Sequence, residues 1–91
     1  MSNCEFPSPF GLWLHVEIRK SGQFKRDISF HSGIHKDCIS RYISGKRAPS
    51  LLNYRCICEA IGHFQGKKLK LSRAEVRILS EQLMVEGLRR L

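Results

Sequence analysis

The chain has few acidic residues and no long hydrophobic run. Lys and Arg total 16 against 8 Asp and Glu, which gives a net charge of +8. No apolar stretch approaches the ~20 residues that cross a bilayer. Residues 1–9 contain Glu5 and two prolines, where a secretory signal carries a basic patch and then an apolar run. We therefore expect a cytoplasmic protein.

Metal-binding and catalytic signatures are also missing. The cysteines are Cys4, Cys38, Cys56 and Cys58, and the last pair is separated by one residue, whereas zinc sites use two to four. The four histidines stand at no ligand-like spacing to them. We expect reduced thiols, no metal and no cofactor; a redox-sensing thiol remains an alternative because it depends on a lowered pKa. With no phosphate loop and no protease pair in 91 residues, we expect no catalytic residues and no enzyme.

The residues present describe a compact basic domain. Hydrophobic residues make up 42% of the chain, enough for a core. Residues 19–47 have a net charge of +6 and residues 67–91 have +4. A folded domain with this charge favours a polyanion as partner, first nucleic acid and then an anionic membrane. We expect nucleic acid, a nucleoid-associated location and no membrane partner, because the basic residues lie beside a turn and not along one amphipathic helix.

The spacing of apolar residues predicts five helices. Pro9 follows a capping serine and begins the first, which ends before Gly22. The next three are expected over about residues 24–31, 35–43 and 51–61, with Gly62 ending the fourth. Residues 67–71 alternate like a short strand. A capping box from Ser72 to Glu75 begins the fifth helix, which runs to about Arg89.

The second and third predicted helices meet the requirements of a helix-turn-helix. Ser29 is small enough for close packing, Gly33 permits a left-handed turn, and Ile39 supplies a branched core residue. The other face of the third helix carries polar side chains suited to base edges, namely Lys36, Asp37, Ser40 and Arg41. Together these offsets predict a DNA-reading unit.

The sequence resembles the lambda-repressor-like helix-turn-helix family, which includes phage repressors, Cro proteins, and many small bacterial regulators and antitoxins. The resemblance covers about residues 9–63. Its most specific part is the run from Ile39 to Ser50. It implies an all-α fold with a four-helix DNA-binding bundle, which we place in residues 1–66. Residues 67–91 are expected to add a C-terminal helix that serves as a dimerisation element. The resemblance also implies that the third helix enters the DNA major groove.

The family pattern assigns further contacts. Lys25 stands where many members have a phosphate-binding Gln, and His35 stands where Ser or Thr commonly caps the third helix. We expect both to contact phosphate, together with Lys46 and Arg47 in the loop that follows. Among the base-contacting residues Arg41 is the best candidate for guanine, and Lys36 is second.

Asp37 and the C-terminal helix leave alternatives open. Asp37 either accepts from a cytosine amine or pairs with Arg41 one turn later. The C-terminal helix has two apolar stripes, so we expect a homodimer interface there, with a helix wedged into its own bundle as the alternative. The expected interface residues are Ile78, Leu79, Leu83, Val85 and Leu88. Leu69 and Leu71 would add a short inter-subunit strand.

These observations predict a sequence-specific regulator of transcription that binds double-stranded DNA. We expect a dimeric repressor of phage or mobile-element type on a palindromic operator, since two copies double the site that one short helix reads. The alternatives are a DNA-binding antitoxin that also binds a toxin, and an anti-repressor module that has lost DNA binding and binds a protein antagonist.

Overall fold

The computed structural model describes residues 8–91, and in that range the protein is all-α. It contains five helices: α1 (Pro9–Lys20), α2 (Lys25–Ser32), α3 (Lys36–Ser44), α4 (Leu51–Leu69) and α5 (Arg73–Arg90). No strand occurs among these residues, and none of their helices is both long and apolar enough to cross a lipid bilayer. The expectation of an all-helical fold is confirmed.

The helices begin at the predicted local signals. The hydroxyl of Ser8 accepts a hydrogen bond from the Gly11 amide at 3.0 Å, with Pro9 at the first helical position. Ser50 caps α4 in the same way, and Ser72 and Glu75 form the predicted capping box at α5. Each cap satisfies an amide that the helix leaves without an internal partner, so the caps set where these helices start.

The fourth helix is longer than the sequence predicts. It continues through Gly62 and Gly66 to Leu69, so the expected end at Gly62 is wrong. The expected strand at 67–71 is wrong too, because residues 67–69 form the last turn of α4. The expected inter-subunit strand of Leu69 and Leu71 is therefore wrong as well. The predicted boundary after residue 66 also falls inside this continuous helix.

Close packing against α5 explains why two glycines persist inside α4. A Cβ atom on Gly62 would overlap the Ser80 hydroxyl, and one on Gly66 would overlap the Val76 side chain. Each glycine costs about 1 kcal/mol of helix propensity relative to alanine. That cost is offset because the missing side chains let the two helices approach along their length.

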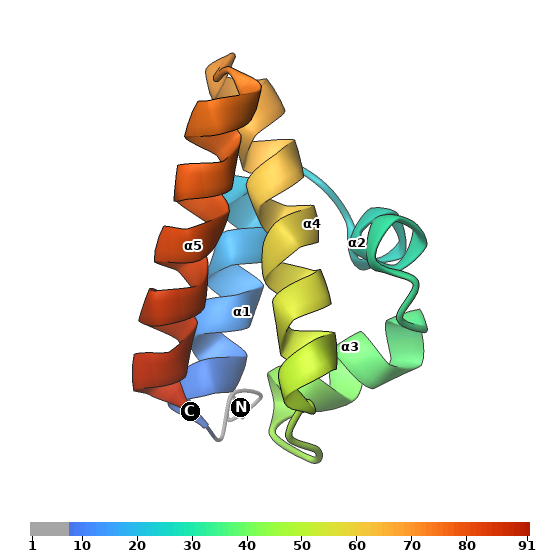
Figure 1. The fold of residues 1–91 in the computed structure, drawn as a ribbon. Helices are drawn as coiled ribbons and strands as arrows, with labels where there is room; N and C mark the ends of the chain where they lie inside the picture. Colours follow the sequence, from blue (N-terminus) through green and yellow to red (C-terminus); the bar gives the residue numbers. More distant parts are fainter. Residues whose placement is uncertain (1–7) are drawn as a thin grey trace.

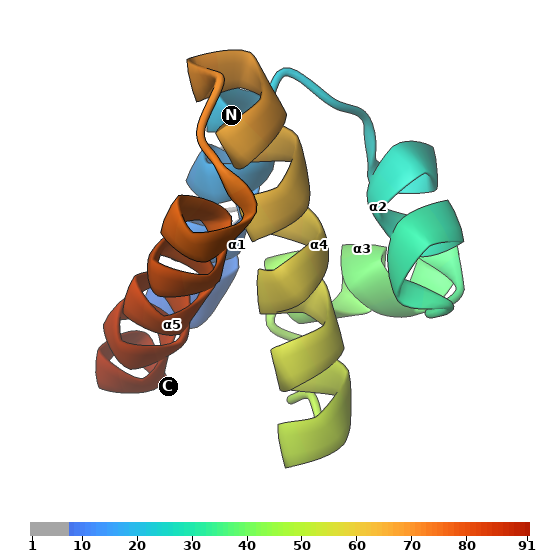
Figure 2. The same cartoon turned by 45° about the horizontal axis from the view of Figure 1, so that its top comes forward.

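The five helices form two groups. Helices α1, α4 and α5 lie side by side, α2 packs on α4, and α3 packs on α2 (Figures 1 and 2). Helix α3 also contacts α1. The body is elongated, with extents of 40 × 23 × 23 Å. This arrangement leaves one face of α3 on the outside of the molecule.

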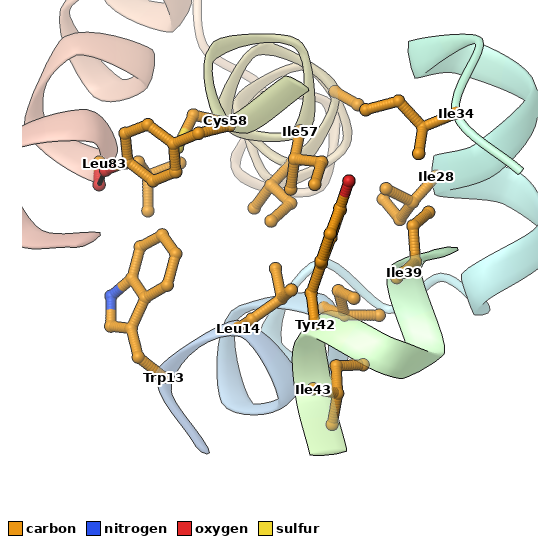
Figure 3. Packing of buried hydrophobic residues seen from close by; sticks show 14 of the residues in the cluster. Trp13, Leu14, Ile28, Ile34, Ile39, Tyr42, Ile43, Ile57, Cys58 and Leu83 are labelled. Atoms are coloured by element: carbon orange, nitrogen blue, oxygen red, sulfur yellow. Dashed lines mark hydrogen bonds between the residues drawn. The ribbon is translucent and has the colours of Figure 1, made fainter. Parts of the chain in front are cut away.

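One continuous hydrophobic core joins the two groups. Figure 3 shows Trp13 and Leu83 at one side of it, and Ile28, Ile34 and Ile39 at the other. Most of the core comes from apolar residues at helical spacing, and the buried ones include Phe10, Trp13, Leu14, Ile18, Ile28, Ile39, Tyr42, Ile43, Tyr54, Ile57, Cys58 and Ile61. Cys38 and Cys56 are partly buried against the core.

Gly11→Ala tests the seam between α1 and α3. A Cβ at this position would overlap the main-chain carbonyl oxygen of Ile43, which cannot move away without shifting α3. We expect a loss of about 1–3 kcal/mol of unfolding free energy, measured by urea denaturation. Leu12→Ala, at a neighbouring side chain that is 47% exposed, is the control. Equal stability of Gly11→Ala and the unmodified protein would contradict this packing.

Candidate nucleic-acid interface

The outer face of α3 carries the residues predicted to contact bases. Ile39, Tyr42 and Ile43 are buried in the core, and helical periodicity then directs the remaining side chains outward. Lys36, Asp37 and Arg41 are exposed, and Ser40 is half-buried at the edge of the face. The predicted base-contacting residues are therefore grouped on one accessible side of a nine-residue helix.

A three-residue turn fixes how α3 leaves α2. Gly33 ends α2 with φ +78°, in the left-handed region that glycine adopts without strain. Ile34 is buried beneath the turn. The His35 Nδ1 atom accepts a hydrogen bond from the Asp37 amide at 3.1 Å, so His35 caps α3 in place of the usual hydroxyl. Helix α3 consequently starts at Lys36.

Lys25 joins the same surface from the first turn of α2. Its Nζ atom lies 3.3 Å from the Ser40 hydroxyl, although the two residues are 15 apart in the sequence. The α2 N-terminus carries no side-chain cap from Phe24, while Asp27 accepts a hydrogen bond from the Phe24 amide at 3.0 Å. First-turn amides and a lysine beside them form a favourable environment for an anion.

The end of α3 leads directly into the basic loop. Gly45 adopts φ +80°, and the amides of Lys46 and Arg47 fold back to donate to the Arg41 carbonyl at 3.0 and 3.3 Å. Both side chains are exposed. The predicted phosphate contacts Lys46 and Arg47 are thus held to the last turn of the helix that carries Arg41.

The cations of this surface are not neutralised within the described part of the chain. No ion pair there involves Lys36, Arg41, Lys46 or Arg47. The carboxylate of Asp37 lies 3.6 Å from His35 Nδ1, and no ion pair joins it to Arg41 among residues 8–91. Arg41 therefore extends from the face with its positive charge available.

Some neighbours of this surface were not singled out by sequence reasoning. Ser44 shares the outward side of α3, and its hydroxyl donates to the Arg41 carbonyl at 3.1 Å. Its position one turn after Ser40 is a signal that the helical period provides. On α2, Phe30 is 92% and Phe24 69% exposed, with the Arg26 guanidinium 5.6 Å from the Phe24 ring centre.

The expected interface on α5 is divided by the structure. Leu83 is buried in the core of its own chain, so assigning it to a dimer contact is wrong, whereas Leu79 is only partly buried against that core. Ile78, Val85 and Leu88 remain about half exposed on the outer side. The reason is that α5 covers α1 and α4 with one of its two apolar stripes.

The cysteine and histidine side chains form no metal centre in residues 8–91, where no group of three potential ligands occurs. Cys38, Cys56 and Cys58 are free thiols, and Cys4 lies outside the described residues. Burial raises the pKa of Cys58 to about 12, despite a hydrogen bond from Tyr54 that acts the other way. This thiol therefore stays protonated at neutral pH, which is the opposite of a redox sensor's requirement.

No family model matches the chain, and no curated protein and no solved structure matches it either. The geometry of α2, α3 and the basic loop is therefore the basis on which a function is argued.

Native Cys58 should resist alkylation. Because its side chain is fully buried and its pKa is raised to about 12, iodoacetamide at pH 8 should modify it only after the protein unfolds. Peptide mapping of alkylated protein with and without urea measures this, and the half-buried Cys56 two residues away is the internal reference. Rapid modification of Cys58 in the folded protein would contradict its place in the core.

Proposed function

We propose that this protein is a sequence-specific, double-stranded-DNA-binding regulator of transcription that acts as a dimeric repressor. The observation that carries the proposal is the face of α3, where Lys36 and Arg41 are exposed with no ion-pair partner among residues 8–91, while Ile39 anchors the opposite side in the core. A short helix with a polar, cationic outer face is the element that fits the major groove.

The surroundings of α3 support the same proposal. Lys25 lies at one edge of the face and Lys46 and Arg47 follow its last turn, so cations lie on both sides of the residues assigned to bases. Contacts to phosphate from such flanking positions set the register of a reading helix without contributing sequence information. The order of the helices and the Gly33 turn agree with the resemblance to lambda-repressor-like proteins.

In this proposal Arg41 reads guanine through its two parallel N–H donors, with Lys36 and Ser40 reading adjacent bases. His35 and Lys25 contact the backbone on the side of α2, while Lys46 and Arg47 contact it beyond the end of α3. Asp37 accepts from a cytosine amine in the groove or holds His35 in place, at the 3.6 Å separation observed.

Arg41→Ala tests the reading face. We expect about 1–3 kcal/mol weaker binding to the preferred site, with discrimination relaxed at one base pair, because a bidentate contact is removed. Electrophoretic mobility shift with the preferred site and single-base variants measures both. Lys46→Gln should instead weaken binding to all sequences alike, and Arg55→Ala on α4 serves as the neutral control. Unchanged affinity of Arg41→Ala would refute this placement of α3.

Dimerisation is proposed through the outer stripe of α5. Ile78 and Val85 line a hollow of about 380 Å³ on this helix, together with Glu81 and Arg89. An antiparallel pair of α5 helices centred on Val85 would set Glu81 of one copy opposite Arg89 of the other, twice over. Apolar burial at the centre and opposite charges at the edges are typical of a self-complementary interface.

Val85→Glu tests this interface. A buried, unpaired carboxylate at the centre of the contact should convert the dimer to monomer and weaken operator binding. Sedimentation equilibrium measures the association state, and circular dichroism checks the fold. Phe30→Glu introduces the same charge at another exposed apolar residue, away from α5, and should stay dimeric. A Val85→Glu protein that remains a dimer would exclude this face.

An antitoxin is the second candidate, and the exposed phenylalanines of α2 favour it. Phe24 and Phe30 are not used by the proposed reading face, and an exposed aromatic pair on one short helix is suited to a protein partner such as a toxin. Co-purification with the product of the adjacent gene, and loss of that complex in Phe30→Ser, would favour this candidate over a stand-alone repressor.

A further inference from the structure

A second cationic surface lies at the other end of α4. Three helix ends meet there, and the Lys68 Nζ atom donates to the Lys20 carbonyl at 3.3 Å, which ties the end of α1 to the end of α4. We call this surface the basic tip; its members are Arg19, Lys20, Lys67, Lys68, Lys70 and Arg73, and all six are exposed. Residues 67–73 include four basic side chains and no acidic one.

The basic tip is distant from the reading face. Figure 1 shows the turn between α4 and α5 at one end of the bundle and α3 toward the opposite end of α4. A helix of 19 residues is about 28 Å long. The Debye length in physiological salt is only about 8 Å. The two cationic surfaces therefore act on separate regions of a polyanion, or on separate polyanions.

Local helix preferences do not account for all of this charge. Lysines at the C-terminal end of α4 interact favourably with the helix dipole, but the left-handed backbone of Lys70 and the charge of Arg73 do not follow from that effect. Lys70 adopts φ +58°, a left-handed conformation that glycine normally takes at this position. Arg73 is the first residue of α5, where a positive charge opposes the dipole. Positions that break local rules are expected where function requires them.

Lys20 of the basic tip pairs with Glu17 at 3.4 Å, but other side chains of this surface are available. In the part of the chain that the structure describes, Lys67, Lys70 and Arg73 have no ion-pair partner. A hollow of about 640 Å³ lies between the connection from α1 to α2 and the last turns of α4, and Lys67 and Lys68 line it. The cations come from three separate helix ends instead of converging on one point, so an extended polyanion fits this surface better than a small ligand.

We propose that the basic tip binds the phosphate backbone of a second DNA duplex while α3 occupies the operator. The contact is independent of sequence, since cations at helix ends reach phosphates and not base edges. A repressor bound at its operator would then bridge to a second DNA segment. This inference rests on the proposed function, because the first duplex is the one that α3 reads.

The test is a two-duplex capture assay with two readouts. Protein is first bound to a biotinylated duplex carrying its preferred site on beads, and a fluorescent duplex of unrelated sequence is then added. Protein retained on the beads reports α3, and captured fluorescence reports the basic tip. Lys67→Gln/Lys70→Gly should be retained normally but capture about ten-fold less of the second duplex, as expected for the loss of two phosphate contacts.

The variants are chosen to preserve the fold. Glycine at position 70 suits the left-handed φ of that residue, so Lys70→Gly should melt no lower than the unmodified protein. Arg26→Gln/Arg55→Gln removes the same charge from α2 and α4 outside the basic tip, and it should capture the second duplex normally. Lys70→Arg keeps the charge and should also capture it normally.

Each remaining outcome of the assay overturns either this inference or the proposed function alone. Normal capture by Lys67→Gln/Lys70→Gly, or no capture by the unmodified protein, overturns the basic tip as a duplex-binding surface. If Lys67→Gln/Lys70→Gly loses binding to phosphatidylserine vesicles but still captures the second duplex, the surface binds a membrane and the duplex-binding inference is overturned too. If the protein shows no preferred site yet captures duplexes through Lys67 and Lys70, the proposed regulator fails and the basic tip stands.

Discussion

The burial of Ile39 is the constraint on which the candidate interface depends. Helix α3 has nine residues, so a single fully buried anchor and its neighbours Tyr42 and Ile43 determine which side faces outward. Ile28 from α2 and Ile34 from the turn are buried beside it. Burying an isoleucine contributes about 1.5–3 kcal/mol. Turning α3 about its axis would expose this side chain, and the orientation of Lys36 and Arg41 is therefore a consequence of core packing.

The long α4 helix connects the two ends of the molecule. It packs against α2 and α5, its first turn follows the basic loop, and its last turn contributes to the basic tip. The glycines at 62 and 66 make this possible, because they let α5 approach closely and complete the core. One helix thereby sets the separation between two cationic surfaces, which is why a single small domain could engage DNA at both.

Local signals made much of the fold predictable. The caps at Ser8, Ser50 and Ser72 act within one helical turn, so the sequence alone places the starts of α1, α4 and α5. The apolar period likewise identifies most of the core. The end of α4 was not predictable in this way, since Gly62 reads locally as a helix breaker and only contact with Ser80, 18 residues later, explains its place inside a helix.

In the candidate site, too, local features could be predicted and contacts between distant segments could not. The spacing from Ser29 through Gly33 to Ile39 predicts the outward face of α3, because these offsets lie within one supersecondary unit. The contact between Lys25 and Ser40, and the choice of α5 stripe that enters the core, depend on packing between distant segments. Two apolar stripes of similar composition give a single sequence no means to decide that Leu83 faces inward and Val85 outward.

Selection of bound sequences from a random pool of double-stranded DNA tests the central claim most directly. If α3 reads DNA, one motif with two inverted half-sites should be enriched, with the half-sites about one DNA turn, ~34 Å, apart. This spacing is expected because two copies of α3 would each enter the major groove on the same side of the duplex. The same selection with Arg41→Ala should yield a motif that is degenerate at one position in each half-site. A pool that shows no enriched motif, or an identical motif with both proteins, would contradict the claim that α3 reads DNA.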